Sequence, residues 1–135
     1  MTPPNNTLEE KRNPKHYKSR SVQCIEFSRH LDFGCGNAFK YIWREGLKDT
    51  SEVERAKIDW YVLDVLVFEP ATLHDALRDI LVRRISLMRD EFEEDAWSLL
   101  VGTLYAASGD YSMLREYANE HKIMKPLAHD VMFGS

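Results

Sequence analysis

Helical spacing of apolar residues recurs along most of the chain, and this feature constrains the fold more than any other. Between Ser21 and Lys122, apolar side chains return every three or four residues in successive segments. The alternation of apolar and polar residues that a half-buried strand requires is missing from the same range. The sequence therefore predicts an all-α protein, a compact bundle of about five to six helices preceded by an extended N-terminal segment.

Capping residues and helix breakers divide this range into segments. Ser51 and Glu54 have the spacing of a capping box, which marks a helix start. Gly46 and Pro70 stand where neighbouring helical patterns stop. We expect helices over six ranges: Ser21 to Leu31, Asn37 to Glu45, Ser51 to Phe68, Thr72 to Arg89, Glu91 to Ser108, and Tyr111 to Lys122 with Asp110 as its cap.

Length and composition predict one globular domain. The 135 residues are 44% hydrophobic and 30% charged, and a chain of this length buries roughly two-thirds of its unfolded surface. We assign residues 1–12 to a flexible polar tail, residues 13–68 to the motif described below, and residues 70–135 to a C-terminal helical extension packed on it. Cys24 and Cys35 are too few for a disulfide framework and lack zinc-site spacing, so we expect reduced thiols packed against apolar neighbours.

No segment has the composition of a membrane span or of a signal peptide. No apolar run approaches the roughly 18 residues that a spanning helix needs, and the first twenty residues contain no hydrophobic stretch. We therefore expect a cytoplasmic protein with no membrane partner.

Charge is distributed unevenly along the chain. Residues 1–48 contain nine Lys or Arg against five Asp or Glu, whereas residues 49–135 contain nine against seventeen. A positive N-terminal part suits a small anionic ligand or an acidic partner surface. The sequence pI near 5.7 makes nucleic acid a poor candidate partner, because duplex DNA requires a broad basic face.

The glycine-rich start of the second predicted helix indicates a phosphate-binding site. Gly34 and Gly36 allow backbone conformations that a β-carbon forbids, and Asn37 is a favourable N-cap. The first turn after such a cap presents unpaired N–H donors and the positive end of the helix dipole. Lys40 and Arg44 follow four residues apart, on one face of the helix. The competing interpretation is an ordinary loop and cap followed by two solvated cations.

Five further residues are candidates by chemistry or position. His16 and Tyr17 could serve as ring donors and a stacking surface for a base, or could anchor the N-terminal segment on the fold. Tyr41 shares the polar side of the second predicted helix with the two cations. Lys48 and Lys57 add positive charge nearby if the second and third helices pack antiparallel.

Motifs for common catalytic and metal sites are absent or have a simpler explanation. The chain lacks a GxxxxGK(S/T) phosphate loop, a GxGxxG dinucleotide motif, an HExxH zinc motif and a GxSxG nucleophile elbow. The acids between Asp90 and Asp95 have a spacing that suits Mg²⁺, but a charged helix N-terminus explains them more simply. The turn within Leu104 to Tyr117 resembles that of a single tetratricopeptide repeat, which we interpret as a helical hairpin. We predict no metal ligands.

Several short motifs in the N-terminal half resemble those of a family of small bacteriophage proteins. They are NPKHY at residues 13–17, GNAFKYIWR at 36–44, GLK at 46–48, AK at 56–57 and WY at 60–61. The resemblance spans Asn13 to Phe68. The chain departs from the family pattern at Val53 to Lys57, and the region after Pro70 has no counterpart in it.

This resemblance implies a protein of the host bacterial cytoplasm that binds a nucleotide or another phosphate-bearing small molecule. The family includes a phage nucleotide kinase that lacks the usual phosphate loop and phosphorylates deoxynucleoside monophosphates. By resemblance the chain could be a nucleoside-monophosphate kinase, with Mg²⁺ brought by the nucleotide. No residue is assigned as the general base, so no catalytic residue is predicted.

Two other functions fit the same sequence. A non-catalytic protein that sequesters a nucleotide signal would share the site and would need neither a base nor a metal. An inhibitor of a host protein would instead use the acidic residues 49–135 as its contact surface. We also expect a homo-oligomer, because Trp43, Trp60 and Tyr61 form more aromatic surface than three short helices can cover.

Overall fold

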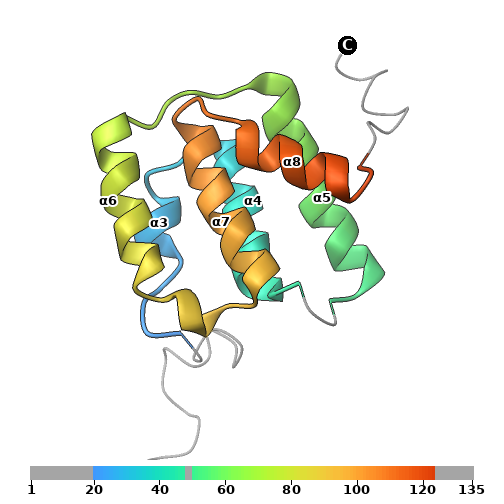
Figure 1. The fold of residues 1–135 in the computed structure, drawn as a ribbon, viewed down its shortest axis with the longest axis horizontal. Coiled ribbons are helices and arrows are strands. Elements are labelled where there is room, and N and C mark those ends of the chain that lie inside the picture. Colours follow the sequence, from blue (N-terminus) through green and yellow to red (C-terminus); the bar gives the residue numbers. More distant parts are fainter. Residues whose placement is uncertain (1–19, 48–49, 124–135) are drawn as a thin grey trace, which may run out of the picture.

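The computed structural model describes residues 20–47 and 50–123, where six α-helices and one 3₁₀ turn follow one another (Figure 1). They are α3 (Ile25–Ser28), α4 (Phe33–Glu45), α5 (Glu52–Phe68), α6 (Asp75–Ser86), η1 (Arg89–Glu91), α7 (Glu94–Ala107) and α8 (Ser112–Glu120). The described residues form no strand, only an isolated bridge between Ala71 and Ser108. The prediction of an all-α bundle is confirmed, while the predicted tail and extended segment lie outside the described residues.

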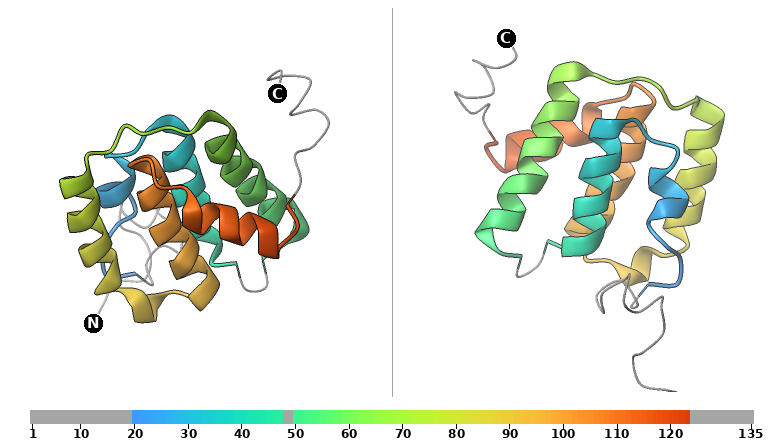
Figure 2. Two further views of the ribbon diagram at one scale, coloured as in Figure 1. Left: turned by 45° about the horizontal axis from the view of Figure 1, so that its top comes forward. Right: turned by 180° about the vertical axis from the view of Figure 1, so that it is seen from behind.

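The helices form two layers (Figure 2). Helices α3, α4 and α5 lie side by side in one layer, and α6, α7 and α8 cover it from the other side. Helix α4 is central, because it packs against α5 within its own layer and against α7 in the other. Across the described ranges, no helix combines the length and the apolar character needed to cross a membrane.

Four aromatic rings from three segments fill the space between the layers. Phe27 of α3 lies 5.6 Å from both Phe39 and Trp43 of α4, measured between ring centroids. Phe92, just before α7, meets Trp43 edge-on at 5.0 Å. Arg20 covers this cluster, since its guanidinium lies 4.2 Å from the Phe92 centroid and donates to the Trp43 carbonyl at 3.0 Å. Trp43 is consequently only 2% exposed. It therefore does not contribute to the exposed aromatic surface from which we predicted a homo-oligomer.

Helix α8 folds back across α7 and α5 (Figure 1). This crossing depends on Gly102 in α7, where an added β-carbon would lie 3.2 Å from the Met113 Cβ and 3.3 Å from Leu114 Cδ2. Leu114 is fully buried at this contact. The turn that resembles a tetratricopeptide repeat thus joins two packed helices, as the sequence predicted.

Local capping signals predicted several helix ends correctly. The Ser51 hydroxyl accepts a hydrogen bond from the Glu54 amide at 3.2 Å, and α5 begins directly after Ser51. Gly46 ends α4 in the left-handed conformation, with φ of 70°. Asp110 was predicted as the cap of the last helix, but the N-cap of α8 is Tyr111, and the Asp110 carboxylate instead accepts from the Ser112 amide at 3.1 Å, one residue earlier in the chain.

The first, fourth and fifth predicted helices begin later in the structure, the first two because of contacts with distant residues and the fifth because of a local turn. The Ser21 amide donates to the Glu91 carboxylate at 2.6 Å, so the first helix begins only at Ile25. Leu73 donates its amide to the Ala107 carbonyl at 2.9 Å, which ties the start of the fourth predicted helix to the end of α7. The fifth starts at Glu94, since residues 89–91 form the 3₁₀ turn instead.

Both cysteines lie in the hydrophobic core as reduced thiols outside any disulfide, as the sequence predicted. Burial raises the pKa of the Cys24 thiol to about 12. Burial also raises the pKa of Cys35, and the nearby Asp32 carboxylate adds to the effect. Neither thiol is therefore a candidate nucleophile near neutral pH.

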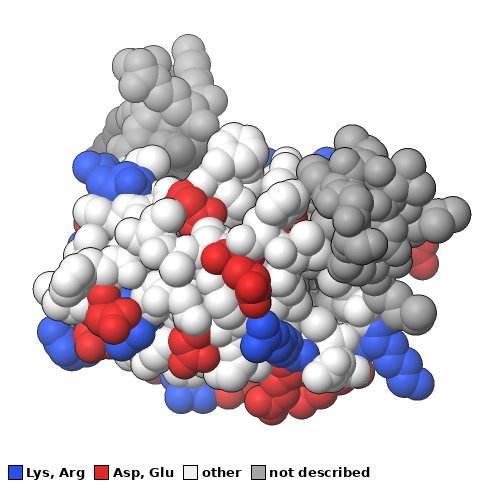
Figure 3. All heavy atoms as spheres, turned by 90° about the horizontal axis from the view of Figure 1, so that it is seen from above, with Lys and Arg blue, Asp and Glu red and all other residues white. Residues whose placement is uncertain are grey.

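Charge is mixed at the end of the bundle where α4 begins and α5 ends. Acidic and basic side chains are interspersed there among uncharged ones (Figure 3). The described part of this face thus offers no continuous basic surface of the kind that duplex DNA requires.

Candidate functional site

The predicted start of the second helix is wrong. Helix α4 begins at Phe33, and Asp32 is its N-cap, accepting a hydrogen bond from the Cys35 amide at 3.2 Å. Gly34 and Gly36 lie within the helix, and among the described glycines only Gly46 and Gly109 have positive φ. Asn37 lies beyond the first turn, so it caps nothing and no glycine bend precedes it.

The N-terminus of α4 consequently faces carboxylates instead of an anionic ligand. The Asp32 carboxylate already accepts a hydrogen bond from one of the N–H groups of the first turn. On the other side, an added β-carbon at Gly34 would lie 3.0 Å from Asp64 Oδ2 of α5. Two acids at a helix N-terminus satisfy its dipole and repel phosphate. We therefore reject the helix N-terminus as the phosphate site.

Replacing Gly36 by alanine tests this correction. A β-carbon there would meet the Ser28 carbonyl oxygen at 3.8 Å and Leu31 Cβ at 3.9 Å, which are ordinary contacts. Alanine in a helix is favoured over glycine, so Gly36→Ala should stabilise the protein by roughly 0.5–1 kcal/mol in urea unfolding. Gly46→Ala is the matched control, and we expect it to cost about 1 kcal/mol because its φ is positive. If Gly36→Ala lowered the free energy of unfolding by as much as Gly46→Ala, the correction would be wrong, and a glycine-dependent bend at position 36 would again be indicated.

The cations on α4 nevertheless converge with a cation of α5 around one aromatic ring. Lys40 Nζ lies 5.7 Å from the Tyr41 ring centroid, Arg44 Cζ lies at 5.1 Å and Lys57 Nζ at 5.8 Å. The Tyr61 ring of α5 stacks on Tyr41 at 5.4 Å with an interplanar angle of 16°. We call these five residues the Tyr41 cluster. The antiparallel packing that would bring Lys57 near the two cations of α4 is present, since α4 and α5 run side by side in opposite directions (Figure 2).

An open cleft lies beside the cluster, on α5. It has a volume of about 470 Å³, which is within the range of small-molecule sites. Its walls are mainly aromatic and aliphatic, and the residues that form them are Tyr41, Val53, Ala56, Lys57, Trp60 and Tyr61. We call it the aromatic cleft. A planar ring could stack against such walls while an attached anion reaches the cations.

Two carboxylates already contact the cations of the cluster. Glu45 accepts from Arg44 Nε at 2.9 Å, and this hydrogen bond raises the pKa of the Arg44 guanidinium. Glu54 lies 3.5 Å from Arg44 Nη2 and 3.4 Å from Lys57 Nζ. All of these side chains remain partly exposed, so the pairs are weak and can exchange partners.

The other predicted site residues divide into three groups. Gly36 faces Ser28 and Leu31 at the turn after α3, where an added β-carbon would make only ordinary contacts, so it contributes no glycine-dependent feature to a site. Asn37 is half-buried and lies one turn before Tyr41, on the same face of α4. The remaining three lie outside the described residues, and they are His16, Tyr17 and Lys48.

Apart from Lys57, the residues of α5 that line the aromatic cleft were missed as site residues, although the sequence holds a signal for two of them. Val53 and Trp60 recur at helical spacing with Lys57 and therefore share one face of α5. In the sequence alone this pattern is indistinguishable from an ordinary buried stripe. The stacking of the Tyr61 ring on Tyr41 distinguishes a site from such a stripe, and this contact becomes visible only when α4 packs on α5.

One family model matches the N-terminal part of the chain. Residues 11–63 match the model of a family described as "Protein of unknown function (DUF3310)". The match covers less than half of the chain, yet it includes the whole Tyr41 cluster and the whole aromatic cleft. No curated protein and no solved structure matches. The family description names no activity, so the relation to a phage nucleotide kinase stays a prediction.

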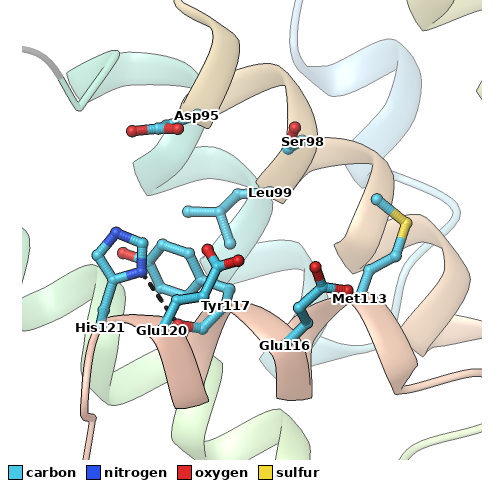
Figure 4. Close-up of a pocket in the computed structure, with 8 residues that line it drawn as sticks. All are labelled: Asp95, Ser98, Leu99, Met113, Glu116, Tyr117, Glu120 and His121. Atoms are coloured by element: carbon cyan, nitrogen blue, oxygen red, sulfur yellow. Dashed lines mark hydrogen bonds between the residues drawn. The ribbon is translucent and has the colours of Figure 1, made fainter.

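A second pocket, between α7 and α8, lies outside the range matched by this family. It has a volume of about 250 Å³, and Figure 4 shows carboxylates from both helices around Leu99 and the Tyr117 ring. The carboxylates are those of Asp95, Glu116 and Glu120. Three acids repel phosphate, so this pocket is a poor nucleotide site.

The polar groups beneath this pocket pair with one another. Tyr117 Oη accepts from Arg55 Nη1 at 3.1 Å and lies 3.4 Å from Asp59 Oδ1. Burial raises the pKa of both Asp59 and Tyr117. Among the described residues, no group of three or more His, Cys, Asp or Glu has an arrangement that could hold a metal ion.

The acids that precede α7 serve the helix start, as the sequence indicated. Glu94 and Asp95 lie in the first turn of α7. Arg89 pairs with Glu94 at 2.7 Å, and Ser21 donates to Glu91. Negative charge at a helix N-terminus is stabilising, so these acids need no metal to explain them.

A third cleft, between α3 and α6, is basic but lacks aromatic walls. Its lining includes Arg29, His30 and Arg84, and its volume is about 500 Å³. Arg84 is paired with Glu26 at 2.7 Å. This cleft could attract an anion, but it offers no ring surface for a base.

Proposed function

We propose that the protein binds a nucleoside phosphate, with the base in the aromatic cleft and the phosphate at the Tyr41 cluster. One observation carries this proposal: three cations from two antiparallel helices lie within 6 Å of a tyrosine ring that also forms a wall of the cleft. Cations bind phosphate through charge-assisted hydrogen bonds. Rings stack on bases without strong sequence preference. The combination favours a nucleotide over inorganic phosphate.

The proposal has a catalytic and a non-catalytic form. In a nucleoside-monophosphate kinase, the three cations would orient the phosphates and offset the charge of the transferring group, and Mg²⁺ would arrive with the donor nucleotide. In a sequestering protein, the same residues would hold one nucleotide unchanged. The described residues form one aromatic cleft beside the cluster, which accommodates the second form directly, whereas a kinase must also place a second nucleotide.

One experiment separates these forms and tests the proposal itself. The four deoxynucleoside 5′-monophosphates are titrated into the full chain by calorimetry, and each is then incubated with the protein, ATP and Mg²⁺ before chromatography. Saturable binding together with a diphosphate product indicates a kinase. Saturable binding with recovery of the unchanged nucleotide indicates sequestration. Absence of binding to all four would contradict the proposed function.

A further inference from the structure

We infer that Glu54 is a built-in competitor for the ligand, and that its carboxylate occupies the position a bound phosphate takes between Arg44 and Lys57. This inference rests on the proposed function. It adds where the phosphate lies and which residue limits the affinity of the site.

The geometry of the Glu54 carboxylate resembles that of a bound anion. Its two oxygens are divided between two helices, with Oε2 at 3.5 Å from Arg44 Nη2 on α4 and Oε1 at 3.4 Å from Lys57 Nζ on α5. The Glu54 side chain is 25% exposed, less than the 40% of Arg44 and the 45% of Lys57. It thus lies below the cations, at the point where both can reach one acceptor.

The first turn of α5 holds the backbone of Glu54 in place, whereas the ion pairs of its carboxylate are long. Its amide donates to Ser51 Oγ at 3.2 Å in the first turn of α5, which fixes the position of the α-carbon. The long contacts to both cations are those of a partly exposed ion pair, which contributes little to stability. A phosphate has more oxygens and more charge than a carboxylate, so it can displace Glu54.

A ligand that displaces Glu54 must break the ion pairs of this carboxylate with Arg44 and Lys57, and its affinity should be lower by the free energy of these pairs. Glu54→Gln removes the competing charge and keeps the size of the side chain, and glutamine also suits this third position of a helix. Because two weak pairs no longer have to be broken, we expect deoxynucleoside monophosphates to bind about three- to tenfold more tightly. The corresponding deoxynucleosides, which lack the phosphate, should show no such gain.

Glu52→Gln is the matched control. Glu52 is exposed in the same first turn of α5, so its replacement changes the net charge equally. If charge acted only at long range, both variants would gain affinity alike. We expect less than a twofold change for Glu52→Gln.

The test measures the four deoxynucleoside 5′-monophosphates and their nucleosides on wild type and both variants by calorimetry. Tighter nucleotide binding by Glu54→Gln alone, with measurable binding by the wild type, supports the inference. Equal or weaker binding by Glu54→Gln, with binding by the wild type intact, overturns the inference and leaves the proposed function standing. If the wild type binds none of the four nucleotides, the proposed function and the inference are overturned together.

Discussion

Replacement of Trp43 by alanine is expected to lower the free energy of unfolding by about 3–5 kcal/mol. Trp43 is 2% exposed and contacts rings from three segments, with centroid distances of 5.0 Å to Phe92, 5.6 Å to Phe27 and 5.9 Å to Phe39. Alanine would leave a large cavity where the two layers of helices meet. Urea unfolding followed by far-UV circular dichroism measures the loss, since fluorescence would change with the removal of the indole itself.

Trp43→Phe provides the control for this prediction. The indole nitrogen of Trp43 is buried and has no hydrogen-bond partner among the described residues, so phenylalanine removes volume without breaking a hydrogen bond. We expect a loss well below that of alanine, about 1–2 kcal/mol. If Trp43→Ala cost less than about 1 kcal/mol, the rings between the layers would not be the centre of the core.

Arg44→Ala and Lys40→Ala are each expected to weaken the binding of a deoxynucleoside monophosphate by about tenfold or more. A charge-assisted hydrogen bond to phosphate contributes roughly 1.5–3 kcal/mol, and every 1.4 kcal/mol corresponds to about a tenfold change in affinity. Both side chains lie beside the Tyr41 ring and are exposed, so their removal should hardly affect folding. Calorimetry gives the affinity, and thermal unfolding gives the stability of each variant.

Arg83→Ala serves as the reference variant for the cation replacements. Arg83 is exposed on α6, away from the Tyr41 cluster, and its replacement removes one positive charge as well. If the cluster variants bind no worse than Arg83→Ala, the cluster is not the phosphate site. If they unfold instead, the two cations serve the structure of the protein.

Local sequence signals were sufficient where neighbouring residues decide the helix end. Ser51 and Gly46 both act through their own turn, and both were predicted correctly. The start of α4 was predicted incorrectly, because aspartate and asparagine are equally good N-caps and Asp32 and Asn37 lie only five residues apart. In the structure Asp32 is the N-cap, and Gly34 therefore lies within the helix, where α5 approaches it closely through Asp64.

The candidate site was predictable to a similar extent. Helical spacing placed Lys40 beside Arg44, and antiparallel packing placed Lys57 near both. The stacking of Tyr61 on Tyr41 and the position of Glu54 between two cations depend on how α4 and α5 pack. No spacing within a single helix contains that information.

The most direct test of the nucleotide site is a titration of ¹⁵N-labelled protein with the four deoxynucleoside monophosphates, followed by amide and indole NMR signals. We predict saturable shifts concentrated at Lys40, Tyr41, Arg44 and Lys57, together with the indole N–H of Trp60. Shifts confined to the pocket between α7 and α8, or no shift with any of the four nucleotides, would contradict the assignment of phosphate binding to the Tyr41 cluster.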